Sequence, residues 1–435
     1  MPAAATTPRA ADAAEPSAAA HRRRVELDEL TEARGSGLLH ELRERFATAI
    51  ATIRSDAVAD DRDGRLQNEG MRALVDSGFT RLRVPAADGG IDVPLVELFA
   101  LLSDLGAADP GVANALRGHF SFIEILRQQS GIPPEVRDHW IGEIATGRII
   151  GNAQTPAPNA PATRVHRAAD GGWRLSGHKY YSSGSLYADY IRASAEDESG
   201  RAMWAIVATD QAAVRRDPDW TGFGQRTSAS GSTAFDDAVV HPLGVLAIDP
   251  EVTQHQSYVQ LYHLATLTGI VREVVDDAIT VNVVRPPRKQ AFGDHALDVV
   301  GSLYISHATA QALLHASADT LDAANARAHA DPEGSRVPYE LLSVHTLASQ
   351  VAVIETALQA TTRLFDAAGA SLASTERALD RHWRNARTIA SHNPVAVKPR
   401  LLGDYLVNGR FYASPFAPFD EDGRPSADRA FRPGE

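Results

Sequence analysis

His392 is the residue of this chain best suited to acid–base chemistry. It stands in a Ser-His-Asn-Pro stretch that follows a helical segment. An imidazole titrates near neutral pH and can donate a hydrogen bond to a developing negative charge. A lone histidine more often satisfies a backbone carbonyl at a helix end, and the residue types by themselves leave both interpretations open.

Two other stretches carry polar groups that could bind a ligand. In the basic run Arg285-Pro-Pro-Arg288-Lys, either guanidinium could bind a phosphate through two parallel hydrogen bonds. The alternative is a basic run that is simply solvated. Ser183 stands in Lys179-Tyr-Tyr-Ser-Ser-Gly, a predicted strand that leads into a turn, where a serine is usually a β-turn residue. The segment Thr155-Pro-Ala-Pro-Asn-Ala-Pro is too rich in proline for a strand, and we expect a loop that covers a pocket.

Several kinds of chemistry are excluded or disfavoured. The chain has no cysteine, so it can form no disulfide, thiolate metal site or cysteine nucleophile. It has 16 histidines, but none stands in a His-Glu-x-x-His pattern, and we expect no metal site. The stretch Gly222-Phe-Gly-Gln-Arg-Thr lacks the third glycine and the βαβ setting of a dinucleotide fingerprint. A bound nicotinamide is therefore not expected.

The composition is that of a globular protein. Asp and Glu number 55 against 43 Lys and Arg, a net charge of -12, which argues against an extended surface for nucleic acid. No uninterrupted apolar run reaches the roughly 18 residues of a membrane helix. The first twenty residues are rich in Ala, Pro and Thr without an apolar signal core, and we expect a disordered tail. These features predict a soluble, cytoplasmic protein.

A segment of short alternating strands is predicted between two segments with helical periodicity. Apolar residues recur at helical spacing in the first part, with a helix break at Asp109-Pro110. Short Gly-, Ser- and Thr-rich segments then predict a small antiparallel β domain, and long Ala/Leu/Val faces predict a packed helical bundle. The predicted divisions are a tail over 1–21, a helical domain over 22–148, a β domain over 149–246, a bundle over 247–410 and a tail over 411–435.

This order of elements and several motifs resemble the acyl-CoA dehydrogenase superfamily. The motifs are Arg83-Val-Pro-Ala-Ala-Asp-Gly-Gly, Trp173-Arg-Leu-Ser-Gly-His-Lys-Tyr-Tyr-Ser-Ser-Gly and Phe235-Asp-Asp-Ala-Val-Val-His-Pro. Two further blocks, beginning at Trp220-Thr-Gly-Phe-Gly-Gln-Arg-Thr and at Arg384-Asn-Ala-Arg-Thr, are similar to flavin-dependent monooxygenases of the dibenzothiophene monooxygenase type. The resemblance covers roughly residues 27–409.

The resemblance implies an α+β acyl-CoA dehydrogenase fold: an N-terminal helical domain, a central small β-barrel or sandwich, and a C-terminal four-helix bundle. Where many dehydrogenases of this fold carry a glutamate base, this chain has His392. The implied function is a two-component FMNH2-dependent monooxygenase, which uses O2 through a flavin hydroperoxide to oxygenate an apolar sulfur- or nitrogen-containing small molecule. A separate flavin reductase would supply the FMNH2.

The resemblance also implies roles for individual residues. His392, Ser183 and His119 are the expected catalytic residues, although His119 could equally belong to the core. The expected cofactor contacts are Asn152, Ala153, Thr155, Lys179, Tyr181, Ser182, Ser183, Arg285 or Arg288, Ala370, Ser371 and His392. FMN is expected rather than FAD, because the loop at Ala370 is poorer in glycine than in FAD-binding relatives. Thr155-Pro156 and Asn159-Ala160 replace the residues that meet acyl-CoA in dehydrogenases.

Two alternatives remain at this point. One is an acyl-CoA dehydrogenase-like oxidoreductase with a relocated base, for which Glu355 and Glu376 are available. The other is a helical scaffold without flavin. The resemblance also implies a homotetramer, since relatives assemble as dimers of dimers through the C-terminal bundle, and the faces over residues 341–364 are more apolar than one subunit needs. The sequence does not identify the substrate or the atom that is oxidised.

Overall fold

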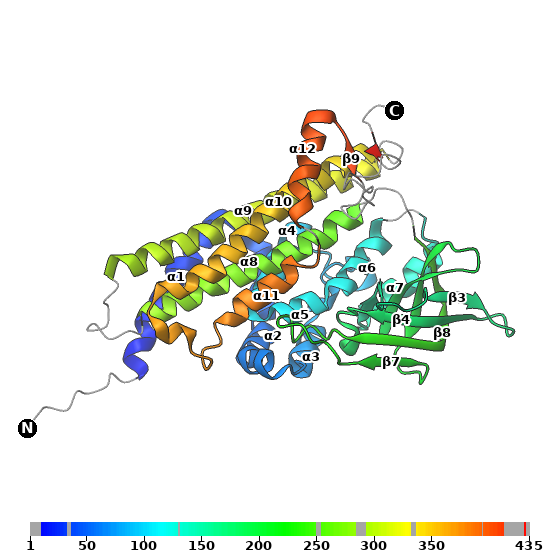
Figure 1. The fold of residues 1–435 in the computed structure, drawn as a ribbon, viewed down its shortest axis with the longest axis horizontal. Helices are drawn as coiled ribbons and strands as arrows, with labels where there is room; N and C mark the ends of the chain where they lie inside the picture. The colour runs from blue at the N-terminus through cyan, green and yellow to red at the C-terminus, as the bar shows by residue number, and fades with distance from the viewer. Residues whose placement is uncertain are drawn as a thin grey trace, which may run out of the picture.

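The computed structural model describes residues 10–32, 36–128, 131–248, 254–283, 293–331, 336–393, 395–412 and 430–431. Helices come first along the chain, strands follow, and long helices end it. In Figure 1 the long helices run side by side through the molecule, the first helices lie beside them, and the β domain lies at one end. This arrangement confirms the predicted fold class.

The N-terminal part consists of helices that pack on one another and on the bundle. They are α1 (Ala10–Glu32), α2 (Ser36–Asp63), α3 (Asn68–Ser77), α4 (Leu95–Ala108), α5 (Pro110–Ala115), α6 (Arg117–Gln128) and α7 (Pro134–Ala145), with 3-10 turns η1 (Phe79–Arg81) and η2 (Ala86–Asp88). The predicted break at Asp109 is present, because its carboxylate caps α5 by accepting from the amides of Gly111 (2.7 Å) and Val112 (3.2 Å). Pro110 fills the first helical position, where its missing N–H does no harm.

The strands form a small barrel. They are β1 (Ile150–Ala153), β2 (Thr155–Pro156), β3 (Arg164–Arg167), β4 (Trp173–Tyr180), β5 (Tyr190–Glu196), β6 (Ala202–Ala208), β7 (Val214–Asp217) and β8 (Ser232–Ala247), with the 3-10 turn η3 (Ser185–Tyr187) between β4 and β5. The pairings β4–β3–β5–β6–β8 return from β8 to β4 and close a ring. Closure leaves few free sheet edges.

Two details of the β domain differ from the sequence prediction. Strand β1 pairs with β5 in parallel, as does Arg164, the first residue of β3, so the domain is not purely antiparallel. The reason is that β1 arrives directly from α7 and runs beside β5. The proline-rich stretch, expected to be all loop, begins with the two-residue strand β2, in which Thr155 pairs with Tyr180 and Pro156 with Lys179. Such an edge position is one that proline tolerates.

The C-terminal part is the bundle. It contains α8 (Gln254–Val283), α9 (Gly293–Ala330), α10 (Arg336–Arg363), α11 (Asp380–Ala390) and α12 (Lys398–Asn408), with 3-10 turns η5 (Leu364–Ala367), η6 (Ala370–Ala373) and η7 (Val395–Val397). Helix α8 lies at its centre and contacts α4, α9 and α10. Two short strands, β9 (Phe411–Tyr412) and β10 (Ala430–Phe431), pair beyond α12. Among the described residues, the segment Pro338–Ala367 is long and apolar enough to span a membrane, but here it packs against α8, α9 and α12.

Candidate functional site

Three distant segments meet at the junction between α5 and α6, which we define as residues 115–118. A Cβ on Gly184 would lie 2.2 Å from the carbonyl oxygen of Ala115, so the turn after β4 is pressed against the junction. A Cβ on Gly118 would lie 2.5 Å from Cβ of Asn152, so β1 is equally close. Arg117, between them, reaches the ring of His392 after α11. The junction therefore gathers residues from the helical, β and bundle parts.

His392 lies in the predicted turn after α11, with its amide donating to the carbonyl of Ile389 over 3.0 Å. Its side chain is exposed to solvent, yet burial lowers its pKa to about 3, with the charges of Arg117 and Lys398 acting in the same direction and a hydrogen bond with Asn393 opposing. The ring is thus accessible to solvent while the guanidinium of Arg117 lies within 3.3 Å of it, and a perturbed pKa of this kind is common at functional sites.

The tautomer of His392 follows from its contact with Arg117. Nη2 of Arg117 lies 3.3 Å from Nε2 of His392. A guanidinium can only donate, so Nε2 accepts and the proton of the neutral ring is on Nδ1. The ring of His263 stands edge-on at 4.5 Å, and its pKa is well below the usual value, mainly through burial and then through the charges of its neighbours. Both imidazoles are neutral near pH 7.

A buried polar network supports the turn that carries His392. The Asn393 amide donates to Oε1 of Gln260 over 2.6 Å, and the Gln350 amide donates to the same oxygen over 2.6 Å. Lys398 in turn donates from Nζ to Oε1 of Gln350. Burial lowers the pKa of Lys398 to about 8. The network joins α8, α10 and α12, so the position of the imidazole depends on three helices.

Ser183 belongs to a chain of hydroxyls on the β side of the site. Its Oγ lies 2.9 Å from Oγ of Ser230, which lies 2.7 Å from Oγ of Ser228. The turn around it is sharp: Tyr181 has φ 54 and Gly184 has φ 78. The neighbouring Ser182 is fully buried, its amide bonds the backbone of residue 231, and its hydroxyl has no partner. Ser183 is thus held at the junction by backbone geometry.

Tyr181 is an exposed aromatic ring beside Ser183. The residue is 52% exposed. The rings of Tyr180 and Trp220 lie 4.5 Å and 5.7 Å from it, and Trp220 is fixed by a bond from Nε1 to the carbonyl of Gly224 (3.0 Å). These rings offer an apolar surface at the rim of the site.

The two sequence blocks similar to the monooxygenases are in direct contact. A Cβ on Gly224 would lie 2.2 Å from the carbonyl oxygen of Arg384. Oδ1 of Asn385 accepts from the amide of Gln225 over 2.5 Å, while its Nδ2 donates to Asp61 of α2 over 3.1 Å. Asn385 therefore ties the loop before β8 to α11 and to the N-terminal helices.

His119, expected as a catalytic residue, belongs to the core. It is fully buried, its Nε2 donates to the carbonyl of Thr80 over 2.8 Å, and its Nδ1 accepts from the amide of Ile150 over 3.2 Å. Burial lowers its pKa to about 4. With both nitrogens engaged in the protein, the ring cannot reach a substrate. The residue of the same motif that contacts His392 is Arg117, which the sequence reasoning did not single out.

Of the expected cofactor contacts, Asn152 and His392 contact the junction and Ser182 and Ser183 precede Gly184, which is pressed against it, whereas Lys179 is engaged elsewhere. Its Nζ donates to the carbonyl of Gln154 (3.2 Å) and to Oγ of Ser194 (2.9 Å), and burial lowers its pKa to about 8. Lys179 thereby fixes the end of β1. Asn152 is half-buried against α6, Ala153 is buried, and Thr155 is exposed.

The expected phosphate ligands fall into two groups. Arg285 and Arg288 lie outside the described residues. Ala370 and Ser371 are exposed in η6, a four-residue 3-10 turn that is too short to act as a helix terminus for an anion. The alternative bases Glu355 and Glu376 are both exposed, and no described contact joins either to His392 or Arg117.

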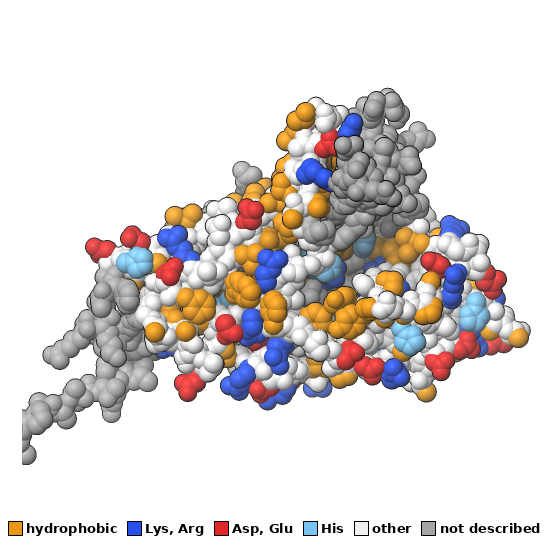
Figure 2. Space-filling model, viewed as in Figure 1, with side chains coloured by type: hydrophobic (Ala, Val, Ile, Leu, Met, Phe, Trp, Pro, Cys, Tyr) orange, Lys and Arg blue, Asp and Glu red, His pale blue; other side chains and the backbone are white. Residues whose placement is uncertain are grey.

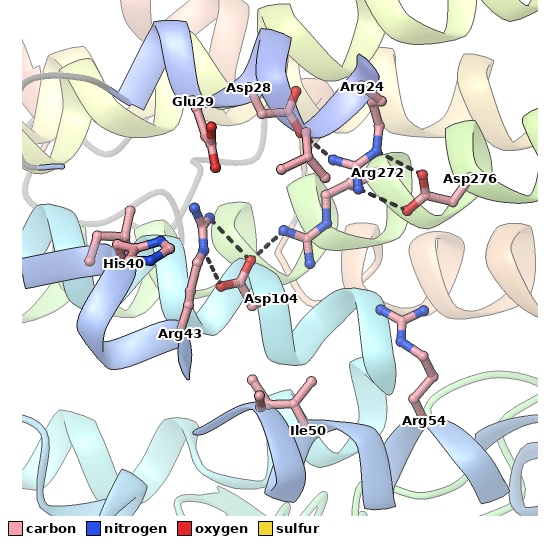
Figure 3. A pocket seen from close by; sticks show the side chains of 13 residues that line it. Arg24, Asp28, Glu29, His40, Arg43, Ile50, Arg54, Asp104, Arg272 and Asp276 are labelled. Carbon is pink, nitrogen blue, oxygen red and sulfur yellow. Dashed lines mark hydrogen bonds and ion pairs between the residues drawn. The ribbon is translucent and has the colours of Figure 1, made fainter. Parts of the chain in front are cut away.

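A large cavity lies away from the junction and is lined by ion pairs. It encloses about 570 Å³ between α1, α2, α4 and α8, and Figure 3 shows charged side chains around it. Asp104 bridges Arg43 and Arg272, and Arg24 pairs with Asp276 at 2.7 Å. These arginines are neutralised by carboxylates, so the cavity is a site of structural ion pairs.

Two family descriptions match the chain. "Acyl-CoA dehydrogenase, N-terminal domain" matches residues 38–148 and "Acyl-CoA dehydrogenase, C-terminal domain" matches residues 261–396, together more than half of the chain. The protein belongs to the acyl-CoA dehydrogenase family.

Within that family the chain is similar to named monooxygenases. It is 28% identical to the probable FMNH2-dependent monooxygenase SfnC of Pseudomonas putida, over 82% of this chain and 92% of that protein. It is 26% identical to a dibenzothiophene monooxygenase of Rhodococcus erythropolis, over 82% and 91%. The methanesulfinate monooxygenase MsuC of Pseudomonas fluorescens superposes with a TM-score of 0.76 at 25% identity, over 86% of this chain and 98% of MsuC.

Proposed function

We propose that this protein is the oxygenase of a two-component, FMNH2-dependent monooxygenase. One observation carries the proposal. At the turn after α11 the site presents a neutral imidazole and a guanidinium in contact, and no Asp or Glu among the described residues bonds to either. Such a site lacks a carboxylate base for desaturation but offers donors for a reaction that develops negative charge on oxygen. The similarity to SfnC and to dibenzothiophene monooxygenases supports the same reading.

The residues at the junction suit reduced FMN. Ser183, Asn152 and Arg117 supply polar side chains for the heteroatom edge of a flavin, and Tyr181 supplies an accessible ring beside them. The unpartnered buried hydroxyl of Ser182 and Nε of Arg117 are free to bond a ligand. When bound, reduced FMN supplies two electrons and two protons, so that one atom of O2 joins the substrate and the other leaves as water. Solved relatives of the same fold are described with FMN bound.

The roles of the protein groups follow from their chemistry. The guanidinium of Arg117 is positive at any working pH and meets negative charge on the oxygen that is released. His392 fixes that guanidinium through Nε2 and keeps its own proton on Nδ1. Ser183 and Asn152 would hold the cofactor from the β side. The network through Gln260 and Lys398 holds the imidazole in place.

Rapid mixing tests the proposal. The protein is loaded anaerobically with FMNH2 and mixed with ¹⁸O2 and a panel of sulfur and nitrogen compounds, and products are analysed by mass spectrometry. We expect one ¹⁸O atom in the product. Steady turnover with NADH, FMN and O2 should begin only when an unrelated flavin reductase is added. Reduction of FMN by this chain alone would show that a nicotinamide site was overlooked, and a failure to bind FMN would favour the scaffold alternative.

A further inference from the structure

A second buried cation lies beside the junction. Arg192 of β5 is 2% exposed, and its guanidinium lies 4.5 Å from the ring centre of Trp204 and 5.3 Å from that of Phe122. Cation–π contacts of this kind hold the group in place without neutralising its charge. In the β1–β5 ladder Arg192 is the register partner of Asn152, one of the residues at the junction.

No carboxylate of the described chain neutralises this guanidinium. Nη2 of Arg192 makes a long bond of 3.4 Å to Oγ of Ser121, while its Nε and Nη1 are buried without a partner. Nε of Arg117 is likewise buried and unpartnered. Burial, and then the charge of Arg117, lower the pKa of Arg192 to about 9, and burial lowers that of Arg117 to about 10.

Other buried arginines of the chain differ in this respect. Nε of Arg83 bonds Glu124 at 2.5 Å, and Arg272 pairs with Asp104. A buried charge that lacks a counter-ion is strongly unfavourable, and such groups are normally paired. Donor atoms left unpartnered at one place therefore indicate that a ligand supplies the missing acceptors.

The two guanidinium groups that lack a counter-ion among the described residues lie near one another. Ser121 and Arg117 are four residues apart on α6, so their side chains lie on one face of the helix. Arg192 bonds the first of these, and the charges of Arg192 and Arg117 are close enough to lower the pKa of Arg192. An anion between them would lie beside His392, which is where a substrate must bind to react.

We propose that Arg192 and Arg117 bind an oxyanion group of the substrate, such as a sulfinate, sulfonate or carboxylate. The identity of the anion as the oxidised substrate rests on the proposed function, whereas its binding does not. The expected sulfur- or nitrogen-containing substrate would then also carry an anionic group. For a sulfinate the reaction balances: the sulfur lone pair takes one atom of O2 to give the sulfonate, and FMNH2 gives two electrons and two protons as the other atom leaves in water.

Calorimetric titration of the full chain tests the site. Methanesulfinate is compared with dimethyl sulfoxide, in which a methyl group replaces the charged oxygen, and each is titrated with and without FMN. We expect the anion to bind about tenfold or more tightly than the uncharged ligand, the scale of hydrogen bonds to a charged group. Equal binding of the two ligands would overturn the proposal.

Single substitutions test whether Arg192 causes the preference for the anion. Arg192→Met keeps a long apolar stem and should lose about tenfold or more in affinity for the anion, with FMN affinity unchanged. Arg192→Lys should recover part of the affinity for the anion. If Arg192→Met fails to fold, the lysine variant, which is the milder change, still tests the site. Arg167→Met is the control, because Arg167 stacks on Trp173 at 4.0 Å in the same domain but is exposed. If Arg192→Met weakened FMN and spared the anion, the arginine would serve the cofactor and the proposal would be wrong.

The two proposals fail separately. Anion binding needs neither flavin nor O2, so an anion site that depends on Arg192 in a protein without oxygenase activity would refute the proposed function alone. Oxygenation of uncharged sulfides with no preference for the anion would refute this inference and leave the proposed function intact.

Discussion

At the level of single residues, Arg117 places the proton of His392, because the guanidinium donates to Nε2 over 3.3 Å and leaves Nδ1 protonated. The depressed pKa of about 3 keeps the ring neutral throughout the neutral range. An acid limb of activity near pH 6.5 should therefore not arise from this histidine.

Replacement of the imidazole tests its role. His392→Phe should keep the fold and most of the FMN affinity, since the ring volume is similar. Product formation should fall about 10²-fold, because the Arg117 guanidinium would no longer be fixed as a preorganised donor, and hydrogen peroxide should accumulate instead. The control is His40→Phe, an exposed histidine on α2. A purely structural histidine would instead lower the melting temperature while activity followed the amount of folded protein.

The core histidine His119 gives a pH prediction. Its pKa is about 4 in the fold against 6.5 for a free side chain, so the unfolded chain binds the proton more strongly. Its contribution to stability is present above pH 6.5 and is lost as pH falls toward 4, by up to about 1.4 kcal/mol per unit. Urea unfolding at several pH values should show a shallower dependence over this window for His119→Gln than for the parent. Identical slopes would contradict the assignment.

At the level of elements, Asn385 couples the loop before β8 to α11. Asn385→Leu removes an acceptor from the Gln225 amide and a donor to Asp61, both in buried surroundings. We expect a stability loss on the order of 1–3 kcal/mol and weaker FMN binding, because the loop that holds Ser230 is loosened. Thermal unfolding and fluorescence titration of FMN measure both. Asn408→Leu, which alters an exposed amide of α12, is the control; unchanged FMN affinity in Asn385→Leu would show that the loop does not support the site.

At the level of the whole molecule, the bundle exposes apolar side chains that suggest assembly. Only 39% of the most apolar window of Pro338–Ala367 is buried within the subunit. Figure 2 shows apolar atoms on the projecting α12. The large apolar side chains exposed on α9, α10 and α12 are Leu297, Ile305, Leu341, Leu406 and Val407. We propose that the bundle mediates a homotetramer, as expected from the sequence.

Light scattering at micromolar concentration tests this assembly. The mass should correspond to four chains, and Ile305→Glu should shift it toward smaller species, because a charge would be buried in the interface. Val239→Glu, an equally large change at an exposed apolar residue of β8, should leave the mass unchanged. A monomer for the parent chain would refute the proposal.

The order of elements could be predicted from the sequence because it depends on local signals. The Asp109-Pro110 break, the turn at Gly184 and the change from helical to alternating period are each set by residues within a few positions. The two monooxygenase-like blocks could also be found, and in the structure they contact each other through Gly224 and Asn385.

The tertiary structure decided the direction in which individual side chains point. Residues 117 and 119 stand two positions apart, and a helix turns about 100° per residue, so they point to nearly opposite sides. His119 bonds the backbone of Thr80 and Ile150 in the core, and Arg117 therefore lies at the site. For Arg192 the local signal was a charge between the apolar residues Ile191 and Ala193 of a strand. Whether a carboxylate would meet it depends on residues far along the chain, which no local pattern specifies.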